Sequence, residues 1–181
     1  MKRFKQQMFL HSELWILTFG GAFQRAGIYK TEILITEKER SDFRNGLKMY
    51  VETHLLLQYK IIISEKSHIE NIQKIVDFST QHAVILSNDT LNFGVAQKLL
   101  NLLLKYHWCI GEIAEPPHFP VDRLIQKEIG CKITNWTELN NVTDYLCIID
   151  AARIKAHEKN MTLAMWELVH FQRNNFKTSN S

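Results

Sequence analysis

Apolar residues recur three and four positions apart along most of this chain, and few helix-breaking residues interrupt them. The clearest run follows Thr36 and Glu39, which have the spacing of a capping box, and continues from Phe43 to Ile61. Only seven glycines and three prolines occur among 181 residues, which favours long helices over many short strands. The sequence therefore predicts an all-α fold, a single compact domain of about seven or eight helices.

The helix boundaries follow from capping residues, glycines and the ends of the apolar runs. Helices are expected over about 3–26, 36–61, 67–79, 90–108, 122–130, 142–160 and from 162 onward. The helix over 90–108 is the most apolar and should be central. Segments 59–64 and 82–87 are compatible with either helix or a short strand. One helical domain is expected over 1–173, followed by a disordered polar tail over 174–181.

Charge, the length of the apolar stretches and cysteine content indicate which partners and which compartment to expect. The net charge of +3 permits an anionic partner without requiring one. The uninterrupted apolar stretch from Leu14 to Phe23 is too short to span a bilayer, so no membrane association is expected. Three cysteines without a CxxC pair predict free thiols and a reducing compartment, and hence a cytoplasmic location.

Common cofactor and metal motifs are missing from the sequence. Neither a P-loop nor a GxGxxG fingerprint occurs, so no nucleotide cofactor is expected. The eight histidines form no HxxxH or HExxH pair, and His107 and Cys109 fall on different sides of a helix. We therefore expect no metal site and no cofactor.

One stretch carries a recognisable pattern. It reads Phe93-Gly94-Val95-Ala96-Gln97-Lys98, followed by an apolar helix and then Pro120-Val121-Asp122. This order resembles the core of the helix-hairpin-helix DNA glycosylase superfamily, in which a Gly-Val-Gly-x-Lys hairpin opens a helix and a Val-Asp begins a later one. Ala96 stands in place of the second hairpin glycine.

The resemblance implies a function on DNA. Lys98 would be the nucleophile that attacks the sugar of an extruded nucleotide and forms a Schiff base. Asp122 would assist departure of the base and stabilise the cationic intermediate. The residues expected to contact the nucleic acid are Gly94, Gln97, Lys105, His118 and Arg123.

A second interpretation of the same residues needs no catalysis. Lys98, Asn101 and Lys105 share one helical face and could be a solvated stripe, while Asp122 could simply cap a helix. The chain would then be a helical binding or scaffolding module, with the proline-rich loop 115–120 as its recognition surface. The two interpretations differ in geometry, because catalysis requires Lys98 and Asp122 to converge on one open cleft with basic walls.

Overall fold

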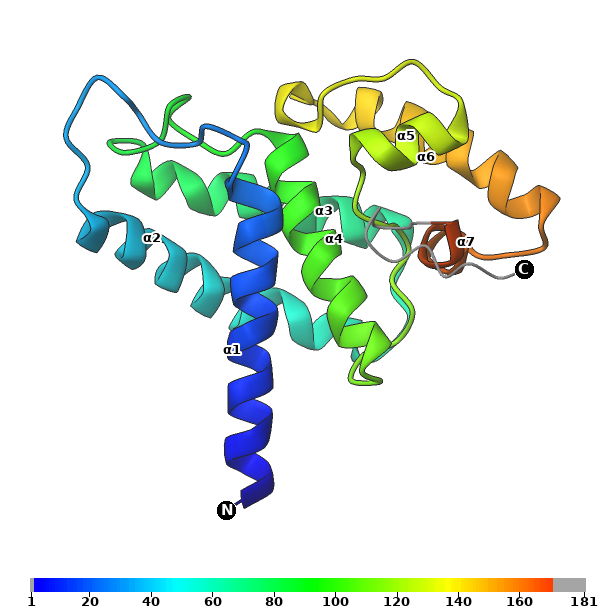
Figure 1. Ribbon diagram of the computed structural model, residues 1–181, viewed down its shortest axis with the longest axis horizontal. Helices are drawn as coiled ribbons and strands as arrows, with labels where there is room; N and C mark the ends of the chain where they lie inside the picture. The colour runs from blue at the N-terminus through cyan, green and yellow to red at the C-terminus, as the bar shows by residue number, and fades with distance from the viewer. Residues whose placement is uncertain (1, 171–181) are drawn as a thin grey trace, which may run out of the picture.

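Seven α-helices make up most of residues 2–170, the part of the chain that the computed structural model describes (Figure 1). They are α1 (Lys2–Phe23), α2 (Glu37–Tyr50), α3 (Glu65–Ser79), α4 (Phe93–Cys109), α5 (Arg123–Ile129), α6 (Val142–Glu158) and α7 (Leu163–His170). The predicted all-α fold is confirmed. The tail expected over 174–181 lies outside the described residues.

Helix α4 is the centre of the fold, as predicted. It packs against α1 on one side and α3 on another (Figure 1). Leu99, Leu100 and Leu103 are fully buried, and most other residues of this helix are also inaccessible to solvent. Because α4 is covered on most of its circumference, several of its polar residues lie inside the molecule as well.

Most helix ends follow the predicted caps. Thr36 and Glu39 form the expected capping box at the start of α2. Asp122 caps α5, and Gly130 ends it in the left-handed conformation at φ +77°. The start of α3 was predicted wrongly, because Ser64 caps it and accepts the backbone N–H of Ser67.

Helix α4 begins later than predicted. The side chain of Asn92 caps it, whereas the Thr90 hydroxyl donates to the backbone carbonyl of Val76 on α3. Thr90 is therefore held in the connecting segment by a long-range contact, which local sequence patterns do not show.

The two ambiguous segments form no sheet within the described residues. After α2 the chain continues through a π-helical turn (Val51–Leu55) and a 3-10 turn (Leu56–Lys60). A further 3-10 turn (Thr80–His82) follows α3, and β-type pairing in the described chain is limited to one isolated bridge between Tyr29 and Leu86.

The loop 115–120 is not an exposed surface. Pro116, His118, Phe119 and Pro120 are all buried. The expectation that this loop presents a recognition surface is therefore wrong, because its prolines and aromatic residue pack against the helices instead of facing solvent.

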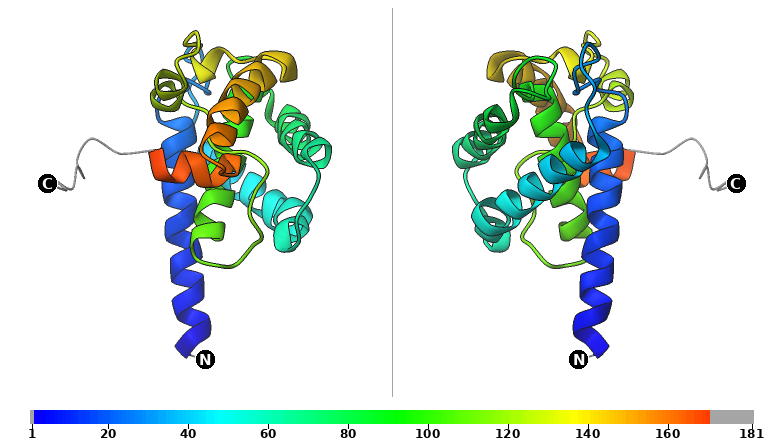
Figure 2. Two further views of the ribbon diagram at one scale, coloured as in Figure 1. Left: turned by 90° about the vertical axis from the view of Figure 1, so that its right-hand side faces the viewer. Right: turned by 90° about the vertical axis from the view of Figure 1, so that its left-hand side faces the viewer.

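Helix α1 is only partly packed. Its N-terminal half projects beyond the other helices, while its C-terminal half lies along α4 (Figures 1 and 2). Phe4 and Phe9 are exposed, whereas Trp15 and Ala22 are buried. Among the described residues, α1 and the other helices all fall short of the length and apolar character that crossing a membrane requires. The three cysteines lie apart as free thiols, as predicted.

Candidate functional site

Lys98 and Asp122 are in direct contact. The Lys98 Nζ lies 2.9 Å from Asp122 Oδ2, and the two side chains are only 8% and 17% exposed. The other carboxylate oxygen, Oδ1, accepts the backbone N–H of Ile125 at 3.0 Å. Asp122 therefore caps α5 and pairs with the lysine of α4 at the same time, so one residue fixes the relative position of the two helices.

This pair lines an open pocket of about 970 Å³. Helix α1 forms one wall through Ile16 and Leu17, and α4 contributes Leu102 and Tyr106. The remaining wall comes from α5, α7 and the aromatic residue Trp136. The pocket is therefore a largely apolar space between the first helix and the C-terminal helices.

A second ion pair lies in the same pocket. The Lys105 Nζ is 2.6 Å from Glu167 Oε2, and Glu167 is almost fully buried. Burial raises the pKa of the Glu167 carboxyl, although the positive charge of Lys105 acts in the opposite direction. Arg25 and Arg123 are exposed at the margin of the pocket.

The amine of Lys98 lies in a desolvated environment. Burial lowers the pKa of the Lys98 amine, and the neighbouring Asp122 carboxylate only partly offsets this effect. The ammonium also lies over the ring of Trp136, 5.5 Å from its centroid. Desolvation of a lysine is one way in which an amine nucleophile is activated, whereas the Asp122 carboxylate acts in the opposite direction.

The structure separates the residues that were expected to contact nucleic acid. Lys105 and Arg123 line the pocket with Lys98 and Asp122. Gln97 is buried and exchanges two hydrogen bonds with the backbone of Val121. It therefore holds the loop before α5 and does not face the pocket.

Gly94 also has a packing role. Its N–H donates to the Leu139 carbonyl at 2.7 Å, and a Cβ at this position would lie 1.7 Å from the backbone oxygen of Trp136. Glycine is thus required for close approach of two backbone segments. This amide is not available to a DNA phosphate, so the hairpin part of the resemblance has no exposed counterpart here.

A closed polar network lies on the neighbouring face of α4. His118 Nδ1 and Asn101 Nδ2 both lie within hydrogen-bond distance of the Tyr145 hydroxyl, at 2.9 and 3.1 Å. His118 Nε2 also meets Glu65 Oε1 at 2.6 Å. His68, which pairs with the Tyr59 hydroxyl at 2.8 Å, packs against the His118 ring. His118 is therefore a core residue, and the solvated stripe proposed for Lys98 and Asn101 is wrong because both are buried.

Sequence reasoning missed the wall of the pocket that α1 provides. Gly20 and Gly21 were the only local signal, because adjacent glycines in a helix suggest a close neighbour. Trp136 carries no such signal. A further group, His11, His107 and Glu112, lies close enough together to hold a metal ion, although no metal motif marks it in the sequence.

No protein-family model matches the chain, and neither curated proteins nor solved structures include a match to it.

Proposed function

We propose that the pocket between α1 and α4 binds a small molecule that combines an apolar or aromatic body with an anionic group. The observation that carries this proposal is the lining of the pocket. Its volume of about 970 Å³ is in the range of small-molecule sites. Its walls are mainly apolar, yet four cationic side chains line it against two carboxylates.

The distribution of charge suggests how such a ligand lies. The carboxylates of Asp122 and Glu167 are already paired with Lys98 and Lys105. Arg25 and Arg123 are exposed at the margin, where a guanidinium can bind a carboxylate or phosphate through two hydrogen bonds. The anionic group therefore lies at the margin, and the apolar body lies toward Leu102 and Trp136.

A fluorescent probe of the same chemistry tests the proposal. Anilinonaphthalene sulfonate has an aromatic body and one sulfonate, and its emission rises when it binds an apolar site. Gly20→Phe should abolish the binding, because position 20 lines the pocket and a Cβ there meets no neighbouring atom within 4 Å. Gln7→Phe, on the projecting half of α1, is the matched control.

The expected result is saturable binding by the wild type and by Gln7→Phe, and at least a tenfold loss in Gly20→Phe. Arg123→Ala should weaken binding severalfold without abolishing it. Equal binding by Gly20→Phe and Gln7→Phe would show that the probe lies elsewhere and would contradict the proposal.

The pairing of Lys98 with Asp122 favours a second candidate function, amine chemistry on damaged DNA. The neutral Lys98 amine would attack the C1′ aldehyde of an abasic sugar, and loss of water from the adduct would leave a C=N bond between lysine and sugar. Asp122, at 2.9 Å, is placed to move the proton that the nitrogen releases to the departing hydroxyl.

Borohydride trapping separates the two candidates. Hydride reduces the C=N bond, so abasic-site DNA should become covalently attached to the wild-type chain. Lys98→Ala should abolish the adduct, whereas Lys127→Ala, a change of an exposed lysine on α5, should leave it intact. Absence of any adduct in the wild type would exclude this chemistry and leave the binding function as the proposal.

A further inference from the structure

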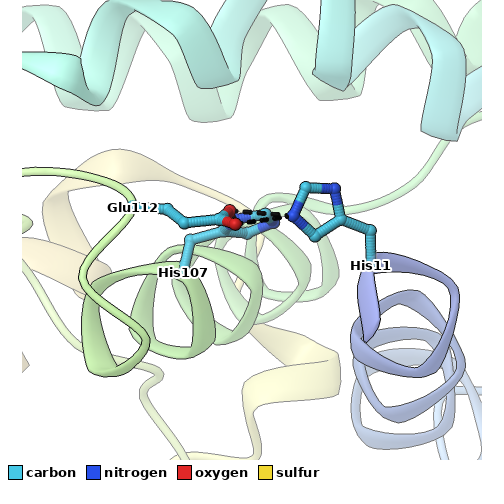
Figure 3. A group of neighbouring side chains, drawn as sticks. All are labelled: His11, His107 and Glu112. Carbon is cyan, nitrogen blue, oxygen red and sulfur yellow. Dashed lines mark hydrogen bonds and ion pairs between the residues drawn. The ribbon is translucent and has the colours of Figure 1, made fainter. Parts of the chain in front are cut away.

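Two helices and a turn bring three metal-ligating side chains together at the end of α4 opposite to its capped start. His11 comes from α1, His107 from the last turn of α4, and Glu112 from the turn that follows (Figure 3). His11 Nε2 lies 2.9 Å from each carboxylate oxygen of Glu112. His107 Nδ1 lies 2.8 Å from Glu112 Oε2.

We propose that His11, His107 and Glu112 form a binding site for a divalent transition-metal ion of the Zn²⁺ class. One ligand atom from each residue lies within 4.8 Å of the others. Two imidazole nitrogens and one carboxylate oxygen are the donor set of many zinc sites with an open fourth position. Ligand atoms of tetrahedral zinc lie about 3.3 Å apart, so the two contacts with Glu112 need to open by about half an ångström. The two imidazole nitrogens, within 4.8 Å of each other, have to reach the same spacing.

The donor types of the cluster suit a cation, because neutral imidazole nitrogens and an ionised carboxylate are the forms that coordinate metal. Other groups nearby also influence the site, since the Lys60 amine donates to the Glu112 backbone carbonyl at 2.7 Å.

The backbone around Glu112 is held in place without any metal. The Glu112 N–H donates to the His107 carbonyl at 2.9 Å, and Gly111 provides the turn with φ +75°. Lys60 fixes the same peptide from outside. The backbone that carries His107 and Glu112 is therefore fixed before any metal binds, and the side chains of all three ligands make the adjustment. This site is separate from the ligand pocket and does not rest on its function.

Titration of the metal-stripped chain with Zn²⁺ by calorimetry tests the proposal. The wild type should bind one ion per chain, and His11→Ala should weaken binding at least tenfold. His11 is 37% exposed, so its loss leaves the fold intact, which circular dichroism would verify. His157→Ala, which removes an exposed histidine from α6, is the control and should bind as the wild type does.

A second measurement distinguishes Zn²⁺ binding at this site from Zn²⁺ binding by cysteine thiols. Zn²⁺ should raise the melting temperature of the wild type and of Cys109→Ser, but not that of His11→Ala, because the ion links α1 to α4. Absence of Zn²⁺ binding by the wild type would overturn the proposal. So would unchanged binding by His11→Ala, or binding that is lost in Cys109→Ser.

Discussion

Two neighbouring faces of α4 carry similar polar side chains in different surroundings. On one face, Gln97 and Asn101 belong to a closed network with His118 and Tyr145. On the other face, Lys98 opens onto the pocket through its contact with Asp122. Polar groups that no solvent or ligand reaches serve the fold, whereas equally buried groups at a cavity can also serve a function.

The largest loss of stability is expected when the closed network is disrupted. His118→Ala removes a fully buried ring together with its contacts to Tyr145 and Glu65, and it leaves a cavity. The free energy of unfolding should fall by about 3–4 kcal/mol, measured by urea denaturation. A loss below about 1 kcal/mol would mean that the network is not part of the stable core and that the contrast between the two faces does not hold.

The next largest loss of stability is expected at Gly94, where a substitution distinguishes a packing role from a phosphate-binding role. In Gly94→Ala, the new Cβ would overlap the Trp136 backbone oxygen, so α4 and the 136–139 segment must move apart. We expect a loss of about 2–3 kcal/mol and an altered Trp136 fluorescence. Full stability of this variant, measured by thermal melting, would show that the close approach is dispensable and would restore the hairpin interpretation.

Acid should lower the stability of the fold through the buried histidines of the network. Burial lowers the pKa of both His68 and His118, so the folded form resists protonation. The stability they contribute is full above the ordinary histidine pKa of about 6.5 and is lost as the pH falls through their folded pKa values. Between pH 7.5 and 5.5 the free energy of unfolding should drop by about 2 kcal/mol.

Glu167 supplies the control for this pH dependence. Its pKa is raised by burial, so its contribution has the opposite sign: it is present at low pH and is lost as the pH rises through the folded pKa. Glu167→Gln removes that contribution and should make the loss of stability between pH 7.5 and 5.5 steeper. A flatter profile in Glu167→Gln would contradict the assigned direction.

The smallest effect on stability is expected at Lys98. In Lys98→Met, Asp122 keeps its cap on α5 and can be hydrated from the pocket, so stability should fall by about 1–2 kcal/mol, less than when one partner of a fully buried ion pair is removed. Calorimetric melting would measure this difference. A loss as large as that of His118→Ala would indicate that the ion pair is structural and would remove the distinction between the two faces.

The sequence was sufficient for those parts of the fold that local patterns determine. The spacing of apolar residues predicted the helices, and Thr36, Asp122 and Gly130 marked their ends correctly. Ser64 was missed because two serines with cap-like spacing lie three residues apart, and only the backbone geometry decides between them. Thr90 was misplaced because its hydroxyl is held by α3, a contact that depends on the tertiary structure.

The candidate sites depended more strongly on long-range contacts. A motif-like order of parts pointed to Lys98 and Asp122, which are 24 residues apart and in contact. Only the adjacent glycines Gly20 and Gly21 hinted locally that α1 would complete their pocket. His11 and Glu112 are 101 residues apart, and a search for closely spaced histidines could not find them. Burial also overturned the expectation that His118 contacts nucleic acid, since this residue lies in the core.

The projecting half of α1 has a consequence for the local dynamics of the chain. A helical segment of about ten residues that lacks tertiary support is close to the limit of stability in water. The amides around Phe4 and Phe9 should therefore exchange with deuterium far faster than those around Trp15 and Ala22, which are buried against the other helices. One continuous helix thus contains two regions of different stability, and proteases should cleave the first while the second stays protected.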